Sequence, residues 1–95
     1  MPWITVSAGP QLAAESADRL AAELAHSAAT AVGLRPTDVL VQVHAALGTA
    51  GTGAVATIAG RARPADVEQA LQHTVRAVTA AHLGLPEDAV GVVRQ

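Results

Sequence analysis

Two arginines, Arg61 and Arg63, are separated by a single alanine and follow a short run of small and β-branched residues. In an extended segment alternate side chains point to the same side, so both guanidinium groups are expected to project together. Each planar guanidinium can make paired hydrogen bonds to a carboxylate. Pro64 and Asp66 begin a helical pattern just after the pair, and the positive end of a helix disfavours arginine unless an anion is present. The pair predicts a carboxylate-binding site, with two solvated arginines as the alternative.

The proline at position 2 is the second residue whose chemistry stands out. Because a small residue follows the initiator methionine, Met1 is expected to be removed, which leaves Pro2 with a secondary amine at the start of a strand. Burial and the positive charges of Arg61 and Arg63 would favour the neutral amine and lower its pKa. A neutral amine can take a proton from carbon and return it elsewhere, which is tautomerisation. A proline that merely begins a strand is the alternative.

Asp38 lies in a turn that precedes the second expected strand. Aspartate in such a place commonly forms the turn or faces solvent, and Asp88 in the second half of the chain is interpreted as its counterpart, which favours that assignment. Arg35 is a lesser candidate for substrate binding, with a solvated side chain as the alternative. No metal and no cofactor are expected, since metal-ligand spacing is absent among the four histidines, His26, His44, His73 and His82.

The composition excludes several classes of protein. Without cysteine there are no disulfides, thiolate metal sites or cysteine nucleophiles. All six basic residues are arginines, so the N-terminus is the one amine able to act as a neutral base near pH 7. A formal net charge of −2 and the lack of a basic patch argue against a nucleic-acid partner. No apolar run approaches the roughly 20 residues that cross a bilayer, so no membrane partner and a cytoplasmic location are expected.

Four strands and two helices are expected to position these residues. Strands are expected at residues 4–8, 39–44, 55–59 and 89–93, where short apolar runs are bounded by glycine and proline. The first helix is expected to hold Pro10 in its first turn and to end at Gly33, a left-handed cap onto which Leu34 folds back. The second is expected to open at Pro64 and to end at Gly84.

The two halves of the chain are interpreted as copies of one unit, since the stretches GLRPTDV and GLPEDAV are near-duplicates at equivalent places. We expect one domain over 1–95, with a β-α-β unit at 1–46, a connection at 47–53 and a second unit at 54–95. The expected class is α+β, with parallel strands in each unit and both helices on one face of a four-stranded sheet. The strands are apolar on both faces, and burial is worth roughly 25 cal/mol per Å². A homo-oligomer is therefore expected.

With these features in place, the chain resembles the tautomerase superfamily, whose members begin catalysis with an N-terminal proline. The resemblance rests on the opening MPWITV and on the repeated strand-helix-strand unit, and it covers nearly the whole chain. The pattern is most similar to malonate semialdehyde decarboxylase and more distantly to macrophage migration inhibitory factor. TIAGRARPADVEQ resembles the strand-end arginine pair of that decarboxylase, and GLRPTDV resembles the segment that carries its water-activating or orienting aspartate.

The resemblance implies a role for each candidate residue. Pro2 and Asp38 would be catalytic, Arg61 and Arg63 would bind a substrate carboxylate, and Trp3 would form an apolar wall beside the proline. The implied activity is keto-enol tautomerisation of a small 2-oxo acid by a homotrimer. Decarboxylation or hydration of a 3-oxo acid, with Asp38 activating water, is the alternative reaction. A non-catalytic oligomeric binding module is the alternative class.

Overall fold

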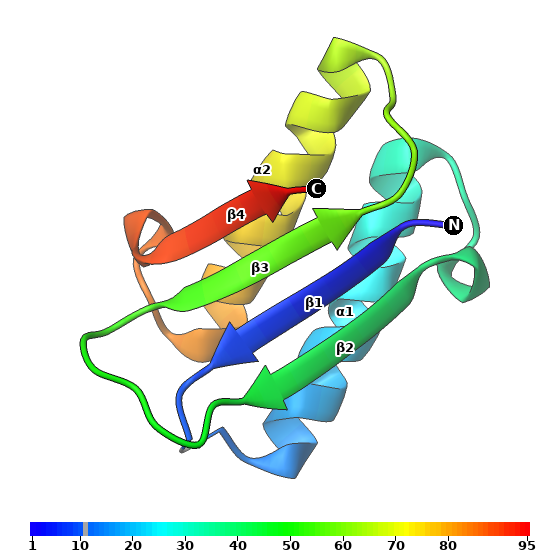
Figure 1. The fold of residues 1–95 in the computed structure, drawn as a ribbon. Helices are drawn as coiled ribbons and strands as arrows, with labels where there is room; N and C mark the ends of the chain where they lie inside the picture. Colours follow the sequence, from blue (N-terminus) through cyan, green and yellow to red (C-terminus); the bar gives the residue numbers. More distant parts are fainter. Residues whose placement is uncertain (11) are drawn as a thin grey trace.

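The chain folds into a four-stranded sheet with two long helices on one of its faces, as the sequence predicts (Figure 1). This computed structural model describes residues 1–10 and 12–95. The elements in chain order are β1 (Trp3–Ala8), α1 (Ala14–Val32), the short 3₁₀ helix η1 (Pro36–Asp38), β2 (Leu40–Ala45), β3 (Ala54–Ala59), α2 (Ala65–Leu83), the short 3₁₀ helix η2 (Glu87–Ala89) and β4 (Val90–Arg94).

The order of the strands across the sheet is β2-β1-β3-β4. β1 pairs with β2 and β3 pairs with β4 in parallel, whereas β1 and β3 are antiparallel. The parallel pairing expected within each unit is therefore confirmed. Because β1 and β3 run in opposite directions, the first residue of β1 lies opposite the last residue of β3, and Trp3 pairs with Ala59 on one side and with Leu40 on the other. The N-terminus is thus held between two segments of the chain.

The hydrophobic core lies between the sheet and the helices. Side chains from alternate positions of β1 and β3 point into it and meet the apolar stripes of both helices, as the period-2 and period-3.6 patterns require. Complete burial of one such side chain contributes about 1.5–3 kcal/mol. The largest fully buried aliphatic side chains are Ile4, Val6, Leu20, Leu24, Ile58, Leu71 and Val75.

Both helices end as predicted, at a glycine in the left-handed conformation. Gly33 has φ 75° and Gly84 has φ 66°, and each donates its N–H to the carbonyl four residues earlier. The next residue folds back in both cases, since Leu34 N–H donates to Ala29 and Leu85 N–H donates to Ala80, each at 2.9 Å. This double closure satisfies carbonyl groups that the end of a helix would leave unpaired.

The start of the first helix differs from the prediction. Pro10 lies in a turn, closed by a 3.3 Å hydrogen bond from Leu12 N–H to the Gly9 carbonyl, and α1 begins only at Ala14. Leu12 precedes the helix and therefore does not share the helical face of Leu20. The physical reason is that β1 stays bonded to the sheet as far as Ala8, whose carbonyl accepts from Ala46 N–H at 2.8 Å. The chain then needs several residues to pass from the sheet to the helix layer.

Two strands are displaced by one residue from their expected positions. β2 begins at Leu40 and β4 at Val90, because η1 and η2 occupy the residues just before them. The two short helices lie at equivalent distances after Gly33 and Gly84, so the near-duplicate stretches do form the same structure. Asp38 is the last residue of η1, whereas Asp88 is the middle residue of η2. The structural equivalent of Asp38 is therefore Ala89, and the interpretation of Asp88 as its counterpart is wrong.

The face of the sheet opposite the helices is uncovered in a single chain. Four large hydrophobic side chains on it remain substantially exposed, namely Trp3 (55%), Leu40 (41%), Val55 (47%) and Val93 (48%). An apolar face of this kind marks an interaction surface. Neither α1 nor α2, the two long helices of residues 1–10 and 12–95, is apolar enough to cross a membrane.

Candidate active site

Pro2 is fixed at the start of β1 rather than carried on a loose tail. Its side chain is less than 2% exposed, and its carbonyl accepts a 3.1 Å hydrogen bond from Leu40 N–H. Met1, in contrast, is exposed. With Met1 in place, the ring of Pro2 therefore occupies a defined and buried position at the start of the sheet.

Gly60 lies directly against Pro2, a contact that the sequence analysis did not identify. A Cβ built on Gly60 would lie 3.2 Å from the Met1 oxygen, 3.2 Å from the Pro2 Cα and 3.7 Å from the Pro2 nitrogen. Gly60 also has φ 128°, a conformation that residues with a side chain rarely adopt. The place of Gly60 in the sequence, between the end of an expected strand and the arginine pair, could have indicated that its backbone approaches another part of the chain closely.

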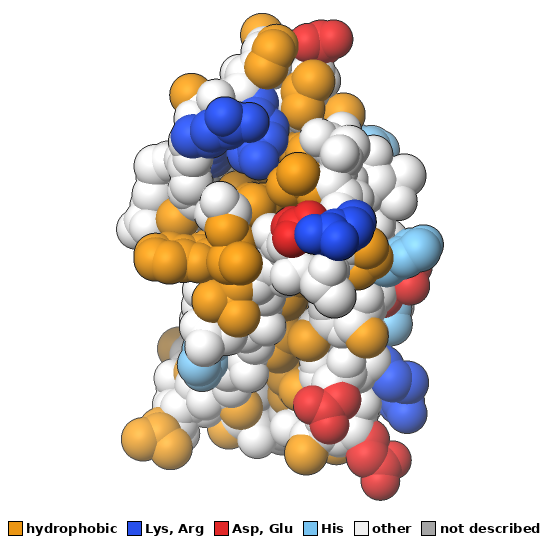
Figure 2. Space-filling model, turned by 90° about the vertical axis from the view of Figure 1, so that its right-hand side faces the viewer, with side chains coloured by type: hydrophobic (Ala, Val, Ile, Leu, Met, Phe, Trp, Pro, Cys, Tyr) orange, Lys and Arg blue, Asp and Glu red, His pale blue; other side chains and the backbone are white. Residues whose placement is uncertain are grey.

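The arginine pair follows Gly60 immediately, so the antiparallel pairing brings it to the same end of the sheet as Pro2. Arg61 is exposed and Arg63 is half-buried. β3 ends at Ala59, and the Arg63 guanidinium turns back to donate from Nη1 to the Arg61 carbonyl at 3.3 Å. Figure 2 views the side of the molecule that holds the N-terminus, where basic side chains gather near one end beside hydrophobic ones.

Arg94, the last residue of β4, is a functional candidate that the sequence analysis missed. Its Nη2 donates to the Arg61 carbonyl at 2.8 Å, and its Nη1 donates to the carbonyls of Ile58 at 3.3 Å and Gln95 at 2.7 Å. Its Nε and Nη2 also donate to the two carboxylate oxygens of Glu68, each at 3.0 Å. This bidentate ion pair connects β4 and α2 to the arginine segment.

Glu68 completes the connection, because its Oε1 also accepts the backbone N–H of Arg63 at 3.1 Å. The hydrogen bond from Arg94 is the main reason why the pKa of Glu68 lies below its ordinary value, with the Arg63 N–H adding to it and burial opposing it. The same hydrogen bond raises the pKa of Arg94. The two side chains are only 17% and 20% exposed, so solvent screens this pair less than it screens a surface pair.

Asp38 and Arg35, both proposed from the sequence, pair with each other. Arg35 Nε donates to Asp38 Oδ2 at 3.2 Å, and the Arg35 side chain is 81% exposed. An exposed pair of this kind contributes about 0–1 kcal/mol. Asp38 is two residues before Leu40, whose N–H donates to the Pro2 carbonyl, so η1 comes just before the residue of β2 that is bonded to Pro2.

Trp3 and Pro2 do not share an environment within one chain. Trp3 lies on the uncovered face of the sheet with more than half of its surface exposed, whereas Pro2 is buried. A single chain therefore provides a fixed proline and a nearby arginine segment, but the indole of Trp3 borders solvent.

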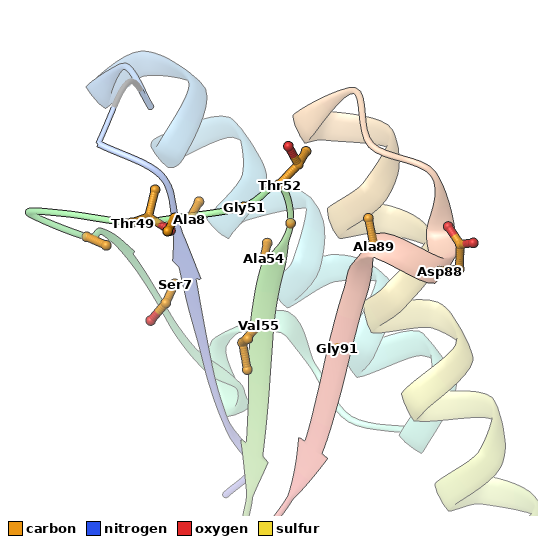
Figure 3. A pocket seen from close by; sticks show the side chains of 13 residues that line it. Ser7, Ala8, Thr49, Gly51, Thr52, Ala54, Val55, Asp88, Ala89 and Gly91 are labelled. Carbon is orange, nitrogen blue, oxygen red and sulfur yellow. The ribbon is translucent and has the colours of Figure 1, made fainter.

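A hollow of about 450 Å³ lies at the opposite end of the sheet (Figure 3). It is formed where β1 ends and β3 and β4 begin, and its lining includes Ser7, Val55 and Asp88 but none of the residues proposed from the sequence. Its lining is mostly small and uncharged, so it offers little chemistry. Among residues 1–10 and 12–95, no three acidic or histidine side chains gather in a way that would hold a metal ion.

Comparison with known proteins relates the chain to solved structures alone, since no protein-family model and no curated protein sequence matches it. Pt0534 inactivated by 2-oxo-3-pentynoate is 20% identical, with 98% of this chain and 83% of that chain covered and a TM-score of 0.86. A fused 4-OT asymmetric trimer is 19% identical over 98% and 84% of the two chains, also with a TM-score of 0.86. Macrophage migration inhibitory factor from Giardia lamblia is 13% identical over 99% and 97%, with a TM-score of 0.79. The chain therefore has the β-α-β fold of the 4-OT and macrophage migration inhibitory factor structures, a mixed four-stranded sheet with two helices.

Proposed function

We propose that this chain is a tautomerase that acts on a small 2-oxo acid, with the amine of Pro2 as its base. The observation that carries the proposal is the position of Pro2, which is buried between Leu40 and Gly60 and next in space to the segment that holds two arginines. The fold, which is that of the 4-OT structures, supports the same activity.

The arginines would bind the carboxylate of the substrate. Among the described residues, no carboxylate forms an ion pair with the guanidinium of Arg61 or Arg63, so both charges remain available to an anion. Binding there would place the carbon beside the ketone near the Pro2 nitrogen. That nitrogen would take a proton from the carbon and then return it to the resulting enolate oxygen, which gives the enol. The guanidinium groups would stabilise the negative charge that develops.

We further propose that the site is completed by a homotrimer. The uncovered apolar face of the sheet supports assembly, and three of the similar fused 4-OT structures are trimers. Packing between copies would bury Trp3 and Leu40, which border the start of β1. It would also enclose an end of the sheet that is open in a single chain.

A covalent label tests the proposed base. Pt0534 is inactivated by 2-oxo-3-pentynoate, an acid whose alkyne is conjugated to its ketone and which therefore reacts with amines. This chain contains no cysteine and no lysine, so the competing nucleophiles are few. We expect one adduct per chain, on the N-terminal peptide, formed more slowly in Arg63→Gln. An adduct on a histidine, or none, would argue against the proposal.

Decarboxylation or hydration of a 3-oxo acid remains the second candidate, because Asp38 lies in η1 close to the segment that binds the Pro2 carbonyl. The variant Asp38→Asn separates the two reactions. For a tautomerase, its turnover of the enol of phenylpyruvate stays within about threefold of the native protein. Loss of carbon dioxide release from a 3-oxo acid in the same variant would favour the second reaction. A native protein that binds carboxylates without turning over either substrate would be the non-catalytic binding module.

A further inference from the structure

We propose that Glu68 and Arg94 are positioning residues, which hold the segment 60–63 in the shape that presents Arg61 and Arg63 to a substrate carboxylate. We call this segment the arginine loop. The inference rests on the proposed function, in which the arginine loop binds the carboxylate. Two residues that would not themselves touch the substrate would thus contribute to its binding through the loop.

The contacts of the pair are made to the backbone of the arginine loop. Arg94 Nη2 donates to the Arg61 carbonyl at 2.8 Å, and Glu68 Oε1 accepts the Arg63 N–H at 3.1 Å. One ion pair therefore fixes both ends of the Arg61–Arg63 tripeptide. It does so without using either arginine's guanidinium as a partner of Glu68.

Arg94 also anchors the loop to the sheet. Its Nη1 donates to the carbonyl of Ile58 in β3 at 3.3 Å, and Arg94 itself is the last residue of β4. The guanidinium thus joins the end of one strand to the loop that leaves the neighbouring strand. Because the side chains of Glu68 and Arg94 are mostly shielded from solvent, this connection is expected to persist in solution.

The charges give the pair a second role. Glu68 carries a carboxylate in direct contact with the arginine loop, and the charge of Arg63 already contributes to the lowered pKa of that group. While Arg94 holds both oxygens of Glu68, this carboxylate does not compete with a substrate for the arginines. Without Arg94, the free carboxylate would attract a guanidinium of the loop and exclude the substrate.

Competition between the Glu68 carboxylate and the substrate predicts an unusual order among variants. Arg94→Gln frees the Glu68 carboxylate and should weaken carboxylate binding by about tenfold, a change of the size expected for charge-assisted hydrogen bonds. The double variant Glu68→Gln with Arg94→Gln removes the competing charge and should recover part of that loss. In a merely structural role, the double variant would bind no better than the single one, since couplings of this kind arise only between interacting groups.

The experiment measures binding and turnover separately. Binding uses 3-phenylpropanoate, which has a carboxylate but no ketone, and turnover uses the enol of phenylpyruvate. Arg94→Gln should raise the Kd and the KM with kcat changed less than about threefold. Arg76→Gln is the matched control, because Arg76 also donates to a backbone carbonyl of β4, that of Val90 at 3.2 Å, but does not contact the loop. Its Kd should equal that of the native protein.

The outcomes distinguish this inference from the proposed function. If Arg63→Gln weakens binding and Arg94→Gln does not, the positioning role is wrong and the proposed function stands. If the native protein does not bind 3-phenylpropanoate at all, both are overturned. If Arg94→Gln does not fold, Arg94→Lys, which keeps the charge, takes its place and should retain part of the native binding. The inference would be overturned if Arg94→Lys lost as much binding as Arg63→Gln while its Arg63 amide stayed protected from hydrogen exchange as in the native protein.

Discussion

The backbone of Gly60 lies against Pro2, so closely that a methyl group there would make an unusually tight contact with it. A Cβ at position 60 would lie 3.2 Å from the Pro2 Cα and 3.7 Å from the Pro2 nitrogen. The pairing of Trp3 with Ala59 in the antiparallel β1–β3 ladder creates this contact. It fixes the distance between the proposed base and the segment that begins the arginine loop.

Replacing Gly60 by alanine should therefore damage stability and activity together. The positive φ of Gly60 would be strained by about 1–3 kcal/mol with a side chain, and the methyl group would push against Pro2. We expect a lower midpoint in thermal unfolding and a reduced kcat. Gly48→Ala is the control, since a Cβ there meets nothing within 4 Å. Equal unfolding midpoints and equal turnover in the two variants would show that the close contact has no consequence.

Charge on the uncovered face of the sheet should dissociate the assembly. Val55 is half-exposed in one chain, and Val55→Glu would bury a carboxylate between copies, which is costly without a partner. We expect sedimentation to show a monomer for this variant and an oligomer for the native protein. Leu47→Glu makes the same change in the connection between the units, where Leu47 is fully exposed, and should remain oligomeric. A native protein that sediments as a monomer would contradict the proposed trimer.

Stability should depend on pH through Glu68. Its pKa in the folded chain lies below the ordinary 4.5, so the ionised form contributes stability above that value and the contribution is lost as the pH falls through the folded pKa. Arg94, the partner of Glu68, has a raised pKa and therefore stays charged throughout this range. The native protein should therefore exceed Glu68→Gln in unfolding free energy by a constant amount at neutral pH. This difference should shrink below about pH 4.5, and a difference that stays constant in acid would rule out the ion pair.

The parts of the fold that follow from local rules could be predicted from the sequence. Gly33 and Gly84 end their helices because a left-handed residue is required there and a hydrophobic residue follows each. The start of α1 could not be predicted, since it depends on how far β1 remains bonded to β2. Pro10 suits a first helical turn on local grounds, but the tertiary path places it in the preceding turn.

The candidate site could likewise be predicted from the sequence only in part. The type and spacing of Arg61 and Arg63 are local features, and they identify the loop. Arg94 is 26 residues from Glu68 in the chain, and its role becomes visible only when parallel pairing places β4 beside β3. The contact between Gly60 and Pro2 likewise depends on the pairing of β3 with β1, which is far away in the sequence.

The role of Pro2 as the base is tested most directly by turnover of the phenylpyruvate enol, measured for native protein whose mass confirms the loss of Met1 and for Pro2→Ala. We predict that the native chain begins at Pro2 and that the variant loses on the order of 10²-fold or more in kcat, the usual contribution of a positioned base. Pro10→Ala, in the turn before α1, should keep native turnover. Retention of Met1 in an active protein, or equal turnover by Pro2→Ala, would contradict the assignment of Pro2 as the base.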